Sequence, residues 1–136
     1  MSETPETHDR AVKVQKDVEE LKEDLQDTWH LNRDRYEKMV INVLHGDPNC
    51  TTLYLEIDGL RSVKEIEDSL SASGCRISQP TLWRASQKLM RGGLIRKVGV
   101  KSKSPIFAKK RWAIALHLDD YVRTKIIEKE GKPQAC

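Results

Sequence analysis

The sequence predicts a mainly α-helical protein with a small β-hairpin. Apolar residues recur at helical spacing over most of its 136 residues, and helix-capping patterns such as Ser62-x-x-Glu65 precede the helical stretches. Strand-like segments flank only one tip, in residues 94–115. Aromatic residues make up 5% of the chain and charged residues 33%, so the core must be mainly aliphatic. The length suits one domain with a modest core.

Residues 1–9 are expected to form a disordered tail, and residues 10–46 an N-terminal helical dimerisation segment. Within the helix from Arg10 to about Leu31, apolar or small residues fall at the a and d positions of three heptads: Ala11, Val14, Val18, Leu21, Leu25 and Thr28. This stripe must pack on a second subunit, which we favour, or on the body of the same domain. We therefore assign Val14, Val18, Leu21 and Leu25 to dimerisation. The stripe shifts near Asn32, which predicts a bend.

Residues 47–116 are expected to form the central domain. Helices are predicted over residues 34–45, 48–58 and 63–71, the second capped by Asp47 and the third by the Ser62/Glu65 capping box. Ser78 caps a further helix that ends at Gly92-Gly93. A strand over 94–100, a flexible tip over 101–105 and a returning strand over 106–115 follow.

A last helix is expected within residues 117–130, starting at Asp119 or Asp120, with a tail over 131–136. Its apolar stripe includes Tyr121, Val122 and Ile126, which we assign to dimerisation together with the N-terminal helix.

The net charge of +3 conceals a segregation of charge. Residues 69–118 contain no Asp or Glu but eleven Lys and Arg, whereas the rest of the chain has 13 basic and 21 acidic residues. Because solvated surfaces usually mix both signs, a basic block of this length indicates a surface for a polyanion. The alternative is a basic face that serves only solubility.

The order of helices, turn, helix and basic hairpin is that of a winged helix-turn-helix core, here flanked by N- and C-terminal dimerisation helices. Three segments resemble ArsR and MarR-type winged-helix transcriptional regulators: Ser62-Val63-Lys64-Glu65-Ile66, Ser78-Gln79-Pro80-Thr81-Leu82, and Leu89 with Gly93-Leu94-Ile95. The resemblance covers roughly residues 53–112. It implies a recognition helix over 78–91 that enters the major groove of DNA, and a basic wing over 97–110.

The helical wheel of residues 78–91 separates two faces independently of that resemblance. Leu82, Ala85, Ser86 and Leu89 share one side, which we expect to face the core. The small Ser86 predicts a close approach by a neighbouring helix. The candidate DNA-binding residues of this helix and the wing are Ser78, Gln79, Thr81, Trp83, Arg84, Gln87, Lys88, Arg91, Lys97, Lys101, Lys103 and Lys109.

Roles within this set follow from side-chain chemistry. Gln79 suits adenine and Arg84 suits guanine, each through a two-pronged contact. Thr81 and Lys88 suit phosphates, and Lys101 and Lys103 suit phosphates or the minor groove. Trp83 departs from the family pattern. It is either a wedge against a thymine methyl or sugar, or a packing residue under the wing.

Other chemistries find little support in the sequence. Cys50, Cys75 and Cys136 form no close pair and the His residues show no ligand spacing, so we expect no disulfide framework, metal or cofactor. A redox role for Cys75 is the less favoured alternative to a structural one. No nucleophile–base or phosphate-loop motif is present, so we expect no enzymatic activity. Without a signal pattern or a long apolar run, the expected location is cytoplasmic and nucleoid-associated.

The sequence therefore predicts a homodimeric transcriptional regulator that binds double-stranded DNA. Two alternatives remain: a sequence-tolerant architectural DNA-binding protein, and a winged-helix module that binds other proteins, with Trp83 as an interface anchor.

Overall fold

The computed structural model describes the backbone of residues 5–128 and the side chains of residues 15–125. The chain divides between Arg33 and Asp34 into two compact units. The described part of the first unit is the helix α1 (Pro5–Leu31). The expected tail over 1–9 is therefore wrong for residues 5–9, which are helical; Pro5 suits a first helical turn, where its missing amide has no helical partner to lose.

Helix α2 (Arg33–Leu44) lies in the second unit from Asp34 onwards, so the boundary between the compact units falls within the segment predicted over residues 10–46. Val40 and Leu44 on this helix have no exposed surface, so its apolar face lies in the core of the second unit. The helices are interrupted at Asn32, where the bend was predicted, and the Asn32 side-chain amide donates to the carbonyl of Thr28 at 2.9 Å.

Two capping predictions are confirmed. Asp47 caps α3 (Pro48–Glu56), its carboxylate accepting from the Cys50 amide at 3.0 Å. In the box that starts α4 (Val63–Ala72), the Glu65 amide donates to Ser62 Oγ at 3.2 Å and the Ser62 amide donates to Glu65 Oε1 at 3.1 Å. Both caps satisfy amides that a helix cannot bond internally, which fixes where each helix begins.

Helix α5 (Gln79–Arg91) begins after the predicted cap Ser78 and ends at Gly92 and Gly93. Gly93 has a φ of +77°, which a glycine adopts without strain. Gly92 allows a close approach, since a Cβ there would lie 2.4 Å from Cγ2 of Val43 on α2. Substitution of Gly92 would therefore push α2 and α5 apart.

The hairpin is shorter and tighter than predicted. Strands β1 (Ile95–Lys101) and β2 (Ser104–Lys109) pair antiparallel, with a register irregularity between Lys97 and Gly99. Ser102 and Lys103 form the whole turn and have φ values of 50° and 66°. Positive φ at both positions matches the right-handed twist of a two-residue hairpin, so residues 101–105 are not a flexible tip.

The returning strand was also predicted too long. It ends at Lys109, and α6 (Arg111–Ala115) follows as a short helix. Trp112 on α6 stacks on Tyr36 of α2, with ring centroids 4.6 Å apart, and Ala113 is buried. These contacts with the core favour a helical turn over a continued strand.

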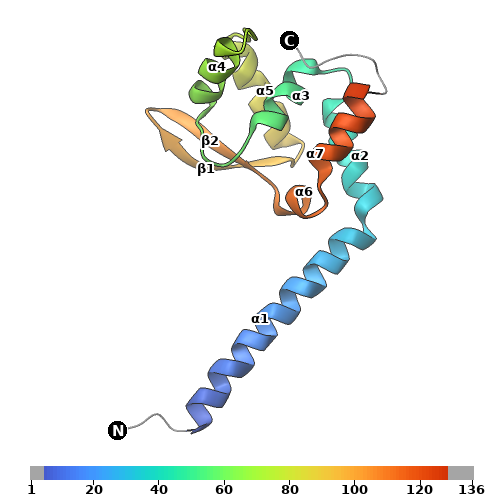
Figure 1. The fold of residues 1–136 in the computed structure, drawn as a ribbon, viewed down its shortest axis with the longest axis vertical. Coiled ribbons are helices and arrows are strands. Elements are labelled where there is room, and N and C mark those ends of the chain that lie inside the picture. Colours follow the sequence, from blue (N-terminus) through green and yellow to red (C-terminus); the bar gives the residue numbers. More distant parts are fainter. Residues whose placement is uncertain (1–4, 129–136) are drawn as a thin grey trace. The chain divides into compact units, whose positions relative to one another are not determined.

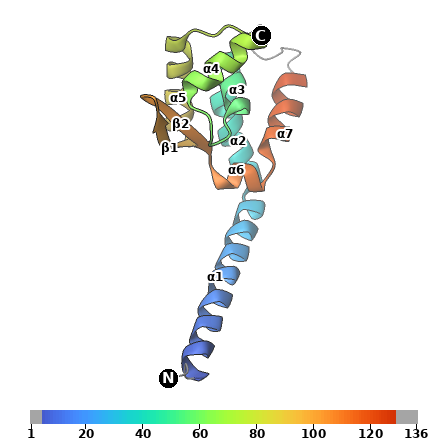
Figure 2. The same ribbon diagram turned by 60° about the vertical axis from the view of Figure 1, so that its left-hand side comes forward.

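The hairpin is anchored to the body through β2. Ser62 forms an isolated bridge with Ile106, and the Gly59 amide donates to the carbonyl of Phe107 at 3.1 Å. Strand β1 is the outer strand (Figure 1). Figure 2 shows α5 and the hairpin on the side of the second unit away from α7 (Leu118–Val122).

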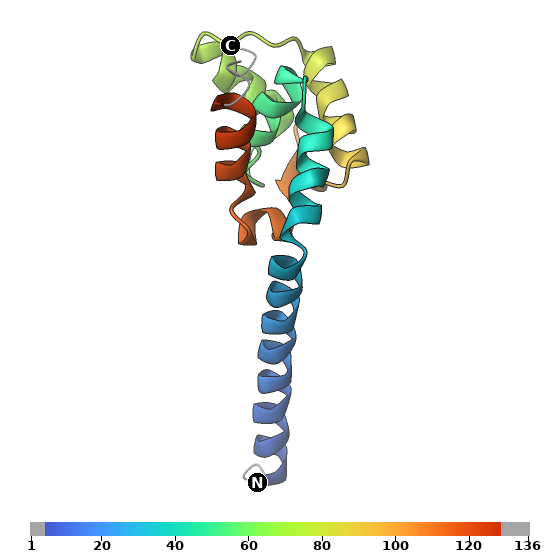
Figure 3. The same ribbon diagram turned by 90° about the vertical axis from the view of Figure 1, so that its right-hand side faces the viewer.

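The C-terminal helices cover the other side. After α7 the chain continues as a π-helical segment, η1 (Arg123–Glu128), and Figure 3 shows this region beside α2. Leu118 and Val122 have no exposed surface. The assignment of Val122 to dimerisation is therefore wrong, because its side chain fills the core of its own unit. Tyr121 is half-buried, while the Ile126 side chain and the predicted tail over 131–136 lie outside the described residues.

Candidate nucleic-acid interface

Helix α5 has one buried and one exposed face, as its wheel predicted. Leu82, Ala85, Ser86 and Leu89 are buried. The exposed side chains are Gln79, Trp83, Arg84, Lys88 and Arg91, while Thr81 and Gln87 are half-buried. Trp83 is 57% exposed, so it does not pack under the hairpin within the described structure. A tryptophan held this far out of the core is available to a partner.

Contacts at its start and middle hold α5 in place. Ser78 Oγ accepts from the Thr81 amide at 3.4 Å and shares a hydrogen bond of 2.7 Å with the Thr81 hydroxyl. The Ser86 hydroxyl donates to the carbonyl of Trp83 at 2.7 Å. The Cys50 thiol on α3 lies 3.8 Å from the carbonyl of Ala85, so α3 approaches α5 closely at the residue before Ser86.

The cysteines offer no reactive thiol among the described residues. Burial raises the pKa of the Cys50 thiol to about 12, so it stays protonated and unreactive near neutral pH. Cys75 is buried and disulfide-bonded, although the spacing and odd number of the cysteines argued against a disulfide framework. The described residues contain no group of three or more metal-ligating side chains.

Three cations of the basic block are held by acids from outside it. Lys88 Nζ lies 2.8 Å from Asp47 Oδ2, and Lys101 Nζ lies 3.1 Å from Glu65 Oε2. The hydrogen bond with Asp47 raises the pKa of Lys88. Partial burial opposes ionisation of Asp47, but its hydrogen bonds with Lys88 and the Cys50 amide lower its pKa overall. Lys88 and Lys101 are therefore exposed cations that already have a partner.

Lys109 does not belong to the interface. It is 9% exposed, pairs with Asp119 and lies with its ammonium 5.0 Å from the centre of the Tyr54 ring. Since alternate strand residues face opposite sides, Lys109 points into the body while its neighbours on β2 lie closer to the surface. Its inclusion among the DNA-binding residues was wrong.

The remaining cations of α5 and the hairpin are exposed and form no ion pair within the described structure: Arg84, Arg91, Arg96, Lys97 and Lys103. Arg96 was not among the predicted site residues, although it lies in the basic block of residues 69–118. Val98 and Val100, also missed, are 43% and 57% exposed on β1. The outer strand therefore adds apolar as well as basic groups to this surface.

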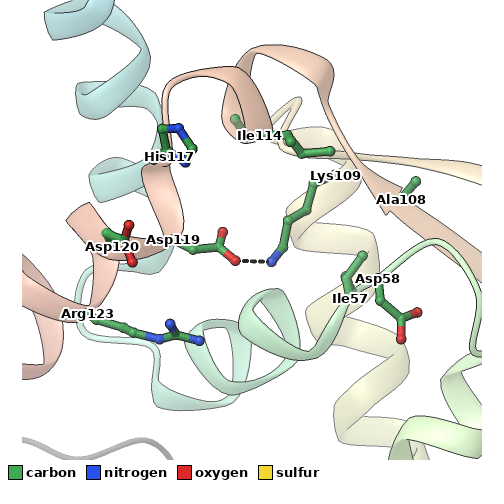
Figure 4. A pocket seen from close by; sticks show the side chains of 10 residues that line it. Ile57, Asp58, Ala108, Lys109, Ile114, His117, Asp119, Asp120 and Arg123 are labelled. Atoms are coloured by element: carbon green, nitrogen blue, oxygen red, sulfur yellow. Dashed lines mark hydrogen bonds and ion pairs between the residues drawn. The ribbon is translucent and has the colours of Figure 1, made fainter.

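A hollow of about 410 Å³, lined by no residue of α5, lies between the end of α3, β2 and the α6–α7 connection. Figure 4 shows Lys109 and Asp119 meeting across it. A second charged group on its wall is also paired, because Asp58 binds Arg61 at 2.8 Å. Hydrogen bonds from the Leu60 and Arg61 amides outweigh the effect of burial and lower the pKa of Asp58 to about 2. These pairs leave the hollow without a clear preference for one ligand charge.

The apolar stripe of α1 is a second candidate binding surface. Val18, Leu21 and Leu25 are 44%, 67% and 48% exposed on the helix of the first unit. The Val14 side chain lies outside those described.

No family model, curated protein or solved structure matches this chain. Within the described part of the chain, no helix is long and apolar enough to cross a membrane.

Proposed function

We propose that this chain is a winged-helix transcriptional regulator that binds double-stranded DNA as a homodimer. The observation that carries the proposal is the exposed face of α5, which carries a glutamine and two arginines, next to a hairpin with three exposed cations. None of these five cations forms an ion pair with a described residue. An amphipathic helix after a turn, with its polar side outward, suits insertion into a major groove.

The exposed groups divide into two roles. Gln79 and Arg84 lie near the start of α5, where they suit base edges, while Arg91 at its end suits a phosphate. Arg96, Lys97 and Lys103 on the hairpin suit phosphates or the minor groove. Lys88 and Lys101 join the interface only by leaving Asp47 and Glu65. Trp83 suits a thymine methyl or a sugar.

The dimer places one α5 in each of two major grooves. Two-fold symmetry then requires a palindromic site with half-sites about 10 base pairs apart. In this dimer, the second copy binds to the apolar stripe of α1.

The test is a binding titration of the full chain against a selected DNA site and a random duplex, between 50 and 200 mM salt. Gln79→Ala with Arg84→Ala should remove the preference for the selected site. Lys97→Ala with Lys103→Ala should weaken both duplexes and flatten the slope of log affinity against log salt by about 1.8, or about 0.9 for each phosphate.

Arg123→Ala provides a matched control, since Arg123 is an exposed cation that belongs neither to α5 nor to the hairpin. It should leave both duplexes unaffected. Equal wild-type affinity for random and selected DNA would replace the regulator with an architectural DNA-binding protein. If neither double variant differs from the control, the interface is wrongly placed.

A protein-binding module is the second candidate, and the exposed apolar groups Trp83, Val98 and Val100 favour it. A protein partner would cover these side chains, and DNA would bind only weakly even at low salt. Absence of DNA binding at 50 mM salt, with capture of a protein that Trp83→Ala abolishes, would select this candidate.

A further inference from the structure

Helix α1 presents large apolar side chains that remain largely exposed in the described part of the chain. Val18, Leu21 and Leu25 lie along one stripe and are each at least 44% exposed. The described side chains on the rest of the helix, from residue 15 to residue 28, are also exposed. A single helix of this composition is only marginally stable in water, so the stripe indicates a helical partner.

The residues at the stripe fit a two-stranded coiled coil. In the predicted heptads, Val18 and Leu25 occupy a positions and Leu21 occupies a d position. Val18 at a with Leu21 at d is the combination that favours two strands over three or four, whereas Leu25 at a does not discriminate.

The charges beside the stripe discriminate between the two helix orientations. Asp17 and Asp24 occupy g positions and Lys22 an e position, and all three are exposed. In a parallel pair, each g residue faces the e residue five positions later on the other chain, so Asp17 faces Lys22 twice. In an antiparallel pair centred on the same stripe, g faces g, and Asp17 faces Asp24.

We propose that α1 pairs with α1 of a second copy as a parallel, in-register coiled coil whose orientation is set by Asp17–Lys22 pairs between the chains. The biological role of this coiled coil rests on the proposed function. In a parallel pair, the second units of both chains follow the same end of the coiled coil. Three heptads form a weak coiled coil, so binding of two DNA half-sites would strengthen the association.

The test reverses each charge in the full chain and measures self-association by sedimentation at 50 mM salt. Asp17→Lys and Lys22→Glu should each associate about tenfold more weakly than wild type, because two attractive pairs become repulsive. An equimolar mixture of the two variants should recover the wild-type affinity, since both pairs are then attractive. At about 1 M salt the differences should shrink, because screening is then strong.

Glu23→Lys is the matched control. It makes the same charge change at the outer f position and should leave association within about twofold of wild type. At concentrations where every variant is associated, circular dichroism should show equal helicity, because the substituted positions are exposed.

Stronger association of Asp17→Lys would overturn the parallel arrangement, because lysine would then face Asp24 of an antiparallel partner. A wild-type chain that remains monomeric at about 100 μM, or variants that all match the control, would overturn the pairing itself. DNA binding of the same samples separates the two proposals. A chain that associates as predicted but binds no DNA refutes DNA binding and leaves the coiled coil standing. A chain that binds DNA but does not associate refutes the coiled coil and the homodimer, and leaves DNA binding by α5 standing.

Discussion

Asp47 connects the stability of α3 to the surface of α5, and a single substitution separates these two contributions. One carboxylate oxygen accepts from the Cys50 amide at 3.0 Å, and the other lies 2.8 Å from Lys88 Nζ. Asp47→Ser keeps an oxygen for the amide but removes the charge, because serine is also a good N-cap. Asp47→Ala removes both.

The magnitudes follow from the exposure of each contact. Loss of an N-cap costs about 1 kcal/mol. The side chains of Lys88 and Asp47 are 47% and 28% exposed, so their ion pair contributes only about 0.5 kcal/mol after solvent screening. Asp47→Ala should therefore lower the free energy of unfolding by about 1.5 kcal/mol, and Asp47→Ser by about 0.5 kcal/mol, in urea titrations.

Asp47→Ser should also bind DNA more tightly than the wild-type chain does. Freed from Asp47, Lys88 can neutralise one more phosphate, which steepens the slope of log affinity against log salt by about 0.9. Asp47→Ser with Lys88→Ala should abolish that gain. The reasoning fails if Asp47→Ser destabilises the protein as much as Asp47→Ala, or if its salt slope equals that of wild type.

Three further predictions concern the second unit. In urea titrations, Asp119→Asn should lower the free energy of unfolding by about 2 to 3 kcal/mol, because it leaves the buried Lys109 ammonium unpaired. Lys109→Met should bind DNA with wild-type affinity. Weaker DNA binding by Lys109→Met at unchanged stability would show that Lys109 contacts DNA. The pKa of Asp58 is about 2 in the folded chain, below its ordinary 3.8, so its stabilisation should be complete above pH 4 and lost towards pH 2. Asp58→Asn should remove that part of the pH dependence, and an unchanged profile would refute the assignment. The free energy of unfolding of Tyr54→Phe should lie within about 0.5 kcal/mol of the wild-type value, because the buried Tyr54 hydroxyl has no partner among the described residues. A decrease of more than about 1.5 kcal/mol would show that the hydroxyl has a hydrogen-bond partner.

Local signals in the sequence were sufficient for much of the helical framework. The Ser62/Glu65 box, the Asp47 cap and the Ser78 cap each depend on residues within three positions, and each forms as predicted. The two faces of α5 follow from helical spacing alone, which also placed Gln79 and Arg84 on the exposed side.

Long-range contacts explain most of the differences. The strand expected to continue to residue 115 becomes α6, where Trp112 stacks on a tyrosine 76 positions earlier. Nothing near Lys109 in the sequence indicates that Asp119 and Tyr54 surround its ammonium. The pairing of Lys88 with Asp47 likewise joins residues 41 positions apart. Such contacts depend on how the helices pack, and a pattern in one stretch of sequence does not contain that information.

The turn of the hairpin was missed for a different reason. Two-residue turns with positive φ usually contain glycine or asparagine, whereas Ser102 and Lys103 occupy this one. The strand register, with Lys101 opposite Ser104, imposes the turn on residues that do not prefer it. Composition alone favoured a longer and looser tip.

A selection of duplexes bound by the full chain from a random pool, at 50 and 200 mM salt, tests DNA recognition by α5 most directly. We predict an enriched palindromic sequence with half-sites about 10 base pairs apart, and loss of that enrichment in Gln79→Ala with Arg84→Ala. Recovery of unenriched sequences by the wild-type chain, or of the same palindrome by the double variant, would contradict a recognition role for this helix.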